Sequence, residues 1–443
     1  MHKLYPEQEN NVAALLDKGS KYRVTLDLSD TGTGKTLVAL EYARRLGRRP
    51  FVIVPKVGVS QFAATAQFQE VELSACRNIE ALKTGKYAEL RRMTSGKMKF
   101  MWQLPQDALF AWDEVHRAGG IESENSELLA MLRAYNIPVH LMSATLATDP
   151  LKLRAVGFLL GLHPYKPLQS YYQWCQGLGC NVNTFTQRWE FDKTAKRAEH
   201  LQRIHALLAP HSVRLRTDDI AGFPENEIIP TLVDLTARDA AEIQELYAGM
   251  AEVVRTCDAA TAEVELLRRR QRAEFLKAGI FADFIEDAVE EEKSVVAFLC
   301  FRDSLAAVKK LLIERGIESV EIVGGQSEAQ RGAAVLAFQN NLNFVMLAMV
   351  QAAGVSLDLN DKYGRPRTAV LTPDWNSTNM KQCFGRIHRA GSKSKATQHV
   401  MMAAGTIETQ VHTTVMRKLS NLAHINDGFV ADAIAEAMQG AIQ

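Results

Sequence analysis

Short apolar runs occur in two separate sets along this chain, and each run is followed by a polar turn and a stretch with helical periodicity. The first set is Tyr22–Leu28, Phe51–Val54, Ala108–Trp112 and Val139–Met142. The second set is Val295–Leu299, Ser319–Val323, Phe344–Met349, Ala369–Leu371 and Val400–Met402. Buried strands that alternate with helices are typical of parallel sheets. The sequence therefore predicts an α/β fold with two parallel-sheet lobes.

Between the two sets the strand pattern gives way to long helix-forming stretches, such as Ala237–Val254 and Ala259–Ala278. We therefore expect three parts: an N-terminal lobe over residues 1–150, a mostly helical insertion over 151–293, and a C-terminal lobe over 294–443. The insertion carries a basic run, Arg268–Arg272, that could contact a phosphate backbone or pair with nearby glutamates. We favour ion pairs, because such pairs are common one turn apart on a helix.

Composition narrows the class of protein. The 443 residues, 47% of them hydrophobic, can bury two ordinary cores. Lys and Arg number 52 against 51 Asp and Glu, so any nucleic-acid surface must be a local groove. The six cysteines include no CxxC pair, which argues against a structural zinc site and fits a reducing compartment. The sequence contains neither a signal core nor a membrane-length apolar run, so we expect a soluble, intracellular protein without a membrane partner.

A phosphate-binding loop is predicted after the first apolar run. The segment reads Ser29, Asp30, Thr31, Gly32, Thr33, Gly34, Lys35 and Thr36, and a helical pattern follows it. Glycines let backbone N–H groups approach phosphate oxygens, Lys35 places a charge on the β and γ phosphates, and the Thr36 hydroxyl can bind Mg²⁺. Ser29 stands where the strict pattern has Gly.

Two further polar segments directly follow apolar runs. Asp113 and Glu114 come after Ala108–Trp112, where one carboxylate could hold Mg²⁺ and the other could polarise an attacking water. Ser143, Ala144 and Thr145 follow Val139–Met142. That tripeptide means little alone, because Ser and Thr are frequent turn residues. Its position in this order makes it a plausible coupling element.

Near the C-terminus, Gln382, Gly385, Arg386 and Arg389 form a fourth group. Arginines three positions apart lie on one helix face, so both guanidinium groups could reach one γ-phosphate. A basic helix face would explain the arginines but not Gln382 and Gly385 at these offsets. His388 is expected to pack or to form hydrogen bonds rather than to bind a metal.

The succession of these segments resembles helicase superfamily two, and within it the Swi/Snf-related ATPases. Further segments that resemble this family are Leu4–Gln8, Val54–Lys56, Arg214–Asp219, Asp374–Asn376 and Gly405–Glu408. The resemblance spans nearly the whole chain and implies two RecA-like lobes and a bracing C-terminal helix. It also implies that ATP and Mg²⁺ are bound.

The resemblance also suggests roles for individual residues. Gln8 would read adenine, with Tyr5 as a stacking partner, and Gln382 would belong to the nucleotide site. Nucleic-acid contacts are implied for Pro55, Lys56, Gly354 and Ser356. Asp358 departs from the family, which usually has Asn there, and we expect its carboxylate to bind a neighbouring backbone amide.

Together these features predict an ATP-dependent translocase on double-stranded DNA, acting as a monomer on double-stranded or branched DNA. We also expect protein partners that act in replication or repair. The alternatives are a strand-separating or branch-migrating helicase, an RNA-directed DExH ATPase, and a clamp that binds ATP without hydrolysing it. The clamp is disfavoured because binding alone requires neither Glu114 nor the two arginines.

Overall fold

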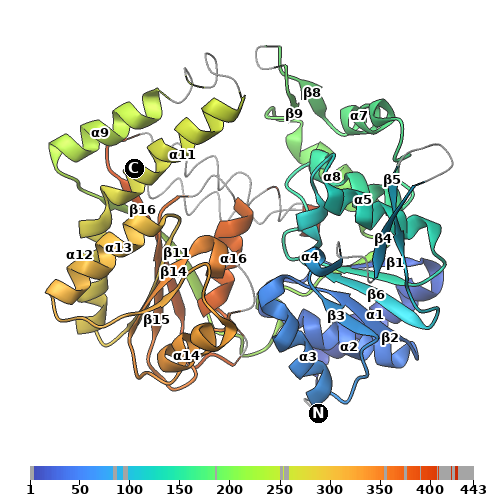
Figure 1. Cartoon of the computed structure of the whole chain (residues 1–443), viewed down its shortest axis with the longest axis horizontal. Helices are drawn as coiled ribbons and strands as arrows, with labels where there is room; N and C mark the ends of the chain where they lie inside the picture. Colours follow the sequence, from blue (N-terminus) through green and yellow to red (C-terminus); the bar gives the residue numbers. More distant parts are fainter. Residues whose placement is uncertain are drawn as a thin grey trace. The chain divides into compact units, whose positions relative to one another are not determined.

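The computed structural model describes residues 4–82, 87–92, 98–184, 187–249, 253, 259–353, 357–373, 377–389, 391–406, 408, 421 and 425–427. The chain divides into two compact units (Figure 1). The first contains the described residues of 1–221 and of 419–434, and the second contains those of 222–418.

The first unit is built on a six-stranded parallel sheet with the strand order β10-β1-β7-β6-β2-β3. Its strands are β1 (Val24–Asp27), β2 (Arg49–Ile53), β3 (Ala75–Arg77), β6 (Ala108–Asp113), β7 (Val139–Met142) and β10 (Ser212–Val213). Its helices are α1 (Pro6–Lys21), α2 (Lys35–Arg45), α3 (Val59–Phe68), α4 (Ile79–Leu82), α5 (Glu124–Met131), α6 (Arg154–Leu159), α7 (Leu168–Gly177) and α8 (Arg197–Leu208). Two antiparallel hairpins accompany the sheet, β4 (Ala88–Arg92) with β5 (Met98–Trp102), and β8 (Cys180–Val182) with β9 (Trp189–Phe191).

Helices cover both faces of this sheet, and the strands are apolar on both sides for that reason. Leu26, Ile53 and Phe110 belong to a core shared with α5, α6 and α8. The alternate position Val52 packs instead with residues of α2 and α3. A parallel sheet buried on both faces requires such continuous apolar strands.

The second unit has its own six-stranded parallel sheet, with the order β11-β16-β15-β12-β14-β13. Its strands are β11 (Asn226–Val233), β12 (Ser294–Leu299), β13 (Val320–Ile322), β14 (Val345–Met349), β15 (Arg367–Leu371) and β16 (Ala396–Ala403). Its helices are α9 (Ala237–Ala248), α11 (Ala259–Phe275), α12 (Ala278–Glu290), α13 (Arg302–Glu314), α14 (Glu328–Gln339), α15 (Val350–Ala353) and α16 (Ser377–Ile387). Helices α12 and α13 share a core with β12, β14 and β15.

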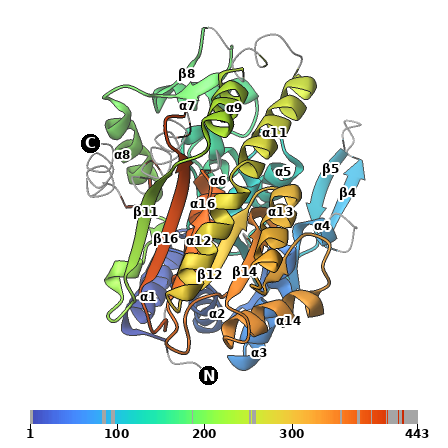
Figure 2. The ribbon, with the colours of Figure 1, turned by 90° about the vertical axis from the view of Figure 1, so that its left-hand side faces the viewer.

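The predicted α/β class with two parallel sheets is confirmed, and the region expected to be a helical insertion is where the structure differs. Its residues divide between the two units, because β10 completes the first sheet and β11 joins the second. β11 pairs with β16 from Asn226 to Val233, and the two strands run side by side in Figure 2. Pro230 and the exposed Glu227 are untypical of a buried strand, so the sequence did not predict β11. Both residues are tolerated because β11 is an edge strand.

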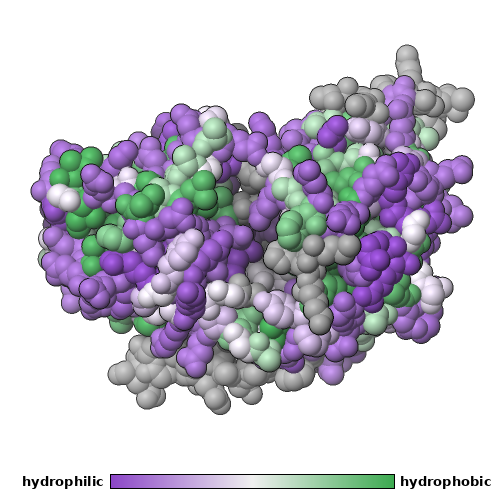
Figure 3. All heavy atoms as spheres, turned by 90° about the horizontal axis from the view of Figure 1, so that it is seen from below, coloured by the Kyte–Doolittle hydropathy of each residue, from purple (hydrophilic) through white to green (hydrophobic). Residues whose placement is uncertain are grey.

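The face of the molecule drawn in Figure 3 is mostly hydrophilic, with apolar side chains in separate small groups. Among the described helices, none combines the length and the apolar composition needed to cross a bilayer.

Candidate nucleotide site

The predicted phosphate-binding loop lies between β1 and α2, at the carboxyl edge of the first sheet. Gly32 and Gly34 adopt left-handed backbone angles, with φ of 84° and 87°. A Cβ added at Gly34 would come within 2.4 Å of the Gln8 amide nitrogen. The backbone angle therefore favours glycine at position 34, and a larger residue would also displace the Gln8 amide. Helix α2 begins directly afterwards at Lys35, and the unpaired N–H groups of its first turn offer a site for a phosphate.

Lys35 is held by the loop itself. Its Nζ donates to the carbonyl oxygens of Ser29, at 2.9 Å, and of Asp30, at 2.8 Å. A phosphate group is negatively charged and is therefore a stronger partner for an ammonium group than a neutral carbonyl. The lysine can therefore exchange these two loop contacts for contacts with a nucleotide.

Ser29 has a structural role that explains its departure from the strict loop pattern. Its Oγ accepts a hydrogen bond from the Leu215 backbone nitrogen at 3.0 Å and another from Asn11 Nδ2 at 3.2 Å. The hydroxyl thus fastens the start of the loop both to α1 and to the segment after β10. No motif marks Asn11 in the sequence, and only the fold brings it to the loop.

Gln8 braces the loop from α1. Its Nε2 donates to the Thr33 carbonyl oxygen at 2.8 Å, and its Oε1 accepts from the Tyr5 backbone nitrogen at 2.9 Å. Gln8 is buried, whereas the Tyr5 ring is exposed. The structure therefore brings both residues to the loop region, and their contact with adenine stays a prediction.

The acidic pair lies on the same edge as the loop. Strands β1, β7 and β6 are parallel neighbours, so their carboxyl ends meet there, and Asp113 is the last residue of β6. Glu114 has a φ of 53°, a costly angle for a residue other than glycine, and its backbone nitrogen donates to Asp113 Oδ1 at 3.0 Å. Desolvation and the Glu114 carboxylate raise the pKa of Asp113 to about 7, and the Lys35 charge opposes this rise.

His116 connects the acidic pair to the predicted coupling tripeptide. Its Nδ1 lies 3.1 Å from Ser143 Oγ and 3.1 Å from Thr145 Oγ1. The same nitrogen lies 3.2 Å from Glu114 Oε2. Ala144, between the two hydroxyl residues, is buried. A change in the position of Glu114 can therefore reach Ser143 and Thr145 through a single imidazole ring.

The residues present fit a bound Mg²⁺. Thr36 and Asp113 offer oxygen donors, and Mg²⁺ is usually held by one or two carboxylates together with the phosphates of its substrate. Asp27, at the end of β1, keeps a buried Oδ2 that has no hydrogen-bond partner among the described residues, and its charge contributes to the raised pKa of Asp113. No three His, Cys, Asp or Glu side chains within the described ranges gather as a metal cluster. The donor set therefore suits a hydrated Mg²⁺ shared with phosphates.

The second group of predicted nucleotide residues lies on α16 and just after it, in the second unit. Arg386 is on the helix and is 3% exposed, whereas Arg389 follows the helix and is partly exposed. Gln382 is buried, and its Nε2 has no hydrogen-bond partner in the part of the chain that the structure describes. The predicted single helix face is therefore only partly formed, because α16 ends at Ile387.

The expected partner of the Asp358 carboxylate was wrong, because the carboxylate lies beside a guanidinium group. Its Oδ1 lies 2.9 Å from Arg389 Nε, and Arg389 Nη2 donates to the Leu357 carbonyl oxygen at 3.1 Å. The sequence led us to expect a backbone amide as the partner of Asp358. The sequence motifs could not reveal the ion pair between Asp358 and Arg389, because the pair forms only when the loop after β14 and the end of α16 fold together.

His388 is confirmed as a packing and hydrogen-bonding residue. Its Nε2 lies 2.8 Å from the Pro224 carbonyl oxygen, and its ring meets Phe223 edge-on at 4.8 Å. These contacts tie the end of α16 to the segment before β11.

The predicted nucleic-acid contacts are only partly described. Pro55 is buried directly after β2, and Lys56 is exposed at the start of the next turn. Gly354, Ser356 and the segment Asp374–Asn376 lie outside the described residues.

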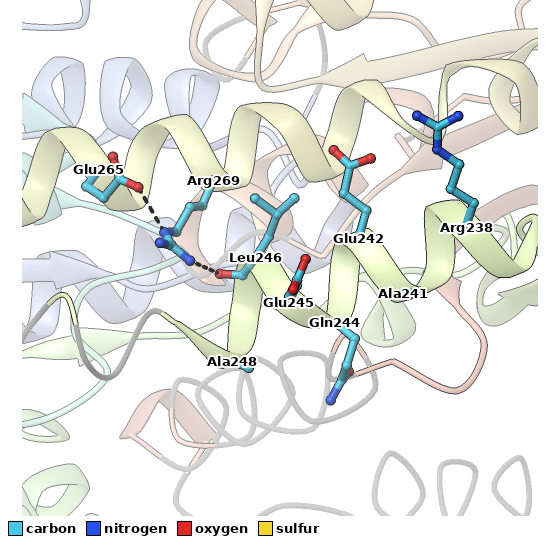
Figure 4. A pocket seen from close by; sticks show the side chains of 9 residues that line it. All are labelled: Arg238, Ala241, Glu242, Gln244, Glu245, Leu246, Ala248, Glu265 and Arg269. Carbon is cyan, nitrogen blue, oxygen red and sulfur yellow. Dashed lines mark hydrogen bonds and ion pairs between the residues drawn. The ribbon is translucent and has the colours of Figure 1, made fainter.

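Two arginines of the basic run on α11 pair with acidic side chains. Arg269 Nε donates to Glu265 Oε1 at 3.1 Å, and its Nη1 donates to the Leu246 carbonyl oxygen of α9 at 3.0 Å (Figure 4). Arg272 pairs with Glu242 of α9 at 2.5 Å. The predicted ion pairing is confirmed for Arg269 and Glu265, so this part of the run serves to join two helices.

Comparison with known proteins finds helicases among the similar proteins. Residues 276–391 match the model of the helicase conserved C-terminal domain, a stretch that contains Gln382, Arg386 and Arg389. A protein of Acanthamoeba polyphaga mimivirus, named provisionally as an ATP-dependent RNA helicase, is 27% identical over 458 residues, which covers 96% of this chain and 84% of that protein. The predicted resemblance to helicase superfamily two is therefore confirmed.

The chain is also similar to proteins of the Swi/Snf-related group, as its motifs predict. Human DNA annealing helicase and endonuclease ZRANB3 is 25% identical over 249 residues, which is 54% of this chain but 22% of ZRANB3. The chain thus matches less than a quarter of that longer relative. It is also similar to a solved structure, the Sulfolobus solfataricus SWI2/SNF2 ATPase core in complex with double-stranded DNA, with 15% identity, a TM-score of 0.37, and coverage of 99% of this chain and 95% of that one.

Proposed function

We propose that this chain is an ATP-dependent translocase on double-stranded DNA. The observation that carries the proposal is the arrangement at the carboxyl edge of the first sheet. The phosphate loop with Lys35 follows β1 there, and the acidic pair lies at the end of β6, with β7 between the two strands. Hydrolysis requires both parts, because the loop binds phosphates and a carboxylate must orient water. A site made for binding alone would need only the loop.

In this proposal, Lys35 and the first turn of α2 would hold the phosphates of ATP, and Thr36 and Asp113 would hold Mg²⁺. The ion would neutralise charge on the β and γ phosphates when bound. Glu114 orients a water and accepts its proton. His116 passes a shift of Glu114 to Ser143 and Thr145, which it contacts at 3.1 Å each.

Arg386 and Arg389 are proposed to supply positive charge to the γ-phosphate during hydrolysis. Arginines brought by a second element stabilise the charge that develops in phosphoryl transfer. Since these arginines belong to the second unit, their arrival would require the units to close on ATP, and release after hydrolysis would let them separate. Repeated closure with alternating grip on a phosphate backbone moves a protein along a duplex independently of base sequence.

Two observations favour double-stranded DNA as the substrate. The segments Asp374–Asn376 and Gly405–Glu408 resemble the Swi/Snf-related family, and one similar protein is named as a DNA annealing helicase. An RNA-directed ATPase is the second candidate, because the mimivirus relative is named for RNA. A strand-separating or branch-migrating helicase would use the same core.

Two substrates separate a translocase from a strand-separating helicase. A translocase should displace the third strand of a DNA triplex in the presence of ATP and leave a forked duplex paired. Lys35→Ala is the control for ATP dependence. Release of a single strand from the fork at the rate of triplex displacement would contradict the proposal and favour the helicase.

A further inference from the structure

One buried arginine links the phosphate loop to a segment from the far end of the chain. Arg214, just after β10, places Nη1 3.0 Å from Asp30 Oδ1 in the loop. Its Nε and Nη2 donate to the two carboxylate oxygens of Asp427, at 2.6 and 3.2 Å. The side chains of Arg214, Asp30 and Asp427 are 15%, 18% and 11% exposed. Arg214 and Asp427 thus form a bidentate, charge-assisted ion pair, and bidentate pairs with a carboxylate are among the strongest contacts that arginine makes.

Arg214 also contacts the backbone that leads into the loop. Its Nη1 donates to the Leu28 carbonyl oxygen at 2.6 Å. The backbone beside it runs along the loop entrance, because Leu28 N donates to Val213 O at 2.9 Å and Asp30 N donates to Leu215 O at 3.0 Å. The guanidinium group is therefore attached to both the main chain and a side chain at the start of the phosphate loop.

The segment that carries Asp427 follows the second unit in sequence but packs in the first. Ile425 is fully buried in the first unit's core, and its carbonyl oxygen lies 3.0 Å from His205 Nδ1. Asn426 Nδ2 donates at 3.1 Å to the carbonyl oxygen of Ala144, the central residue of the coupling tripeptide. Asn421 Nδ2 donates at 3.2 Å to the Thr148 carbonyl oxygen. We call the described residues Asn421 and Ile425–Asp427 the return segment.

The charge balance makes the arginine sensitive to the return segment. Burial lowers the pKa of Arg214, but the Asp30 and Asp427 carboxylates raise it by more, so the guanidinium remains charged. Removal of one carboxylate leaves a buried cation with half of its compensation, a costly condition. Arg214 would then be drawn to Asp30 alone, and the loop entrance that it holds would shift.

We propose that Arg214 is a positioning residue through which the return segment sets the order of the phosphate loop, so that nucleotide affinity depends on Asp427. This inference rests on the proposed ATP site. The ATP site is thereby linked to a segment that follows the second unit in sequence.

The test compares nucleotide affinity with stability in the full chain. Binding of a fluorescent ATP analogue with Mg²⁺ is titrated for wild type, Asp427→Asn, Asp427→Glu, Arg214→Lys and Asn421→Ala, and Tm is measured without nucleotide. Asp427→Asn should weaken binding by about fivefold or more, the lower range of coupling between sites. Arg214→Lys should behave alike, because lysine cannot form the bidentate pair. Asp427→Glu keeps the charge and should recover part of the affinity.

Asn421→Ala is the matched control, because it loosens the same segment at Thr148 without touching Arg214. It should lower Tm and leave affinity within about twofold of wild type, below the usual range of coupling between sites. Unchanged affinity in Asp427→Asn, or equal weakening in Asn421→Ala, would overturn the inference. Failure of the wild-type chain to bind the analogue would instead overturn the ATP site itself.

Discussion

Arg389 and Asp358 form an ion pair within the second unit, with Arg389 Nε 2.9 Å from Asp358 Oδ1. Arg389 is one of the two arginines proposed to act on the γ-phosphate, so a carboxylate holds a residue that the reaction needs elsewhere. The side chains are 21% and 37% exposed, and a pair with this exposure contributes about 1 kcal/mol or less. The contact is therefore weak enough to break when a phosphate competes for the guanidinium group.

Asp358→Asn should raise kcat/KM for ATP by up to about fivefold, because the competing carboxylate charge is lost and about 1 kcal/mol is released. Steady-state ATP hydrolysis checks this. Glu314→Gln, which removes an exposed pair with Lys310 on α13, is the control and should have no effect. A lower kcat/KM in Asp358→Asn would mean that the carboxylate helps to place Arg389 for the reaction.

Lys35→Ala should abolish ATP hydrolysis, because the charge on the β and γ phosphates is lost. The substitution also removes the two hydrogen bonds from Nζ to the loop carbonyls, so circular dichroism must show that the chain still folds. Lys21→Ala, at an exposed pair with Asp17 in the same unit, is the matched control. A normal turnover rate in Lys35→Ala would disprove the site assignment.

Arg386→Ala should lower turnover by roughly 10³-fold, as loss of an arginine finger does in other phosphoryl-transfer enzymes. ATP binding should largely persist, because the phosphate loop lies in the first unit. Single-turnover hydrolysis and analogue titration measure the two effects separately. Equal losses of binding and turnover would argue against an arginine that acts only during hydrolysis.

Asp113→Asn should stabilise the protein against heat at alkaline pH while abolishing hydrolysis. The pKa of Asp113 is raised to about 7, so the stability linked to this carboxyl is fully present below its unfolded-state pKa and is lost as pH rises through 7. Asparagine cannot ionise, so the Tm of the variant should exceed that of wild type by a few degrees at pH 8 and match it at about pH 4.

The control for that measurement is Asp107→Asn. Its pairing with Arg49 lowers the pKa of Asp107, so neutralisation there should not raise Tm at pH 8. A Tm difference between Asp113→Asn and wild type that does not change with pH would contradict the assigned cause.

Lys56→Ala should weaken DNA binding and reduce the slope of log affinity against log salt by about 1, as loss of one phosphate contact does. Fluorescence anisotropy with duplex DNA over a salt series measures both. An unchanged slope would remove Lys56 from the DNA surface.

Much of the fold could be predicted because its core strands are short, apolar and buried on both faces. The sequence did not predict strands β11 and β10, and each omission has a physical cause. β11 contains Pro230, which is allowed only because the strand lies at the sheet edge. β10 is only Ser212–Val213 and carries no periodic signal of its own.

The residues of the candidate site could also be predicted only in part. Lys35, Asp113 and Thr145 could be found because each lies in a recognisable motif at or after the end of a strand. The partners of these motifs depend on contacts between segments far apart in the chain. Asn11 reaches Ser29 only when α1 packs beside the loop, and Arg214 reaches Asp427 across 213 positions of sequence.

The most direct test of the central claim is steady-state ATP hydrolysis by the full chain with no nucleic acid, linear double-stranded DNA, single-stranded DNA, forked DNA or RNA, with Arg386→Ala as control. We expect double-stranded DNA to stimulate hydrolysis most, and the variant to stay near background with every nucleic acid. Stimulation by RNA alone, or hydrolysis that no nucleic acid changes, would contradict a DNA translocase.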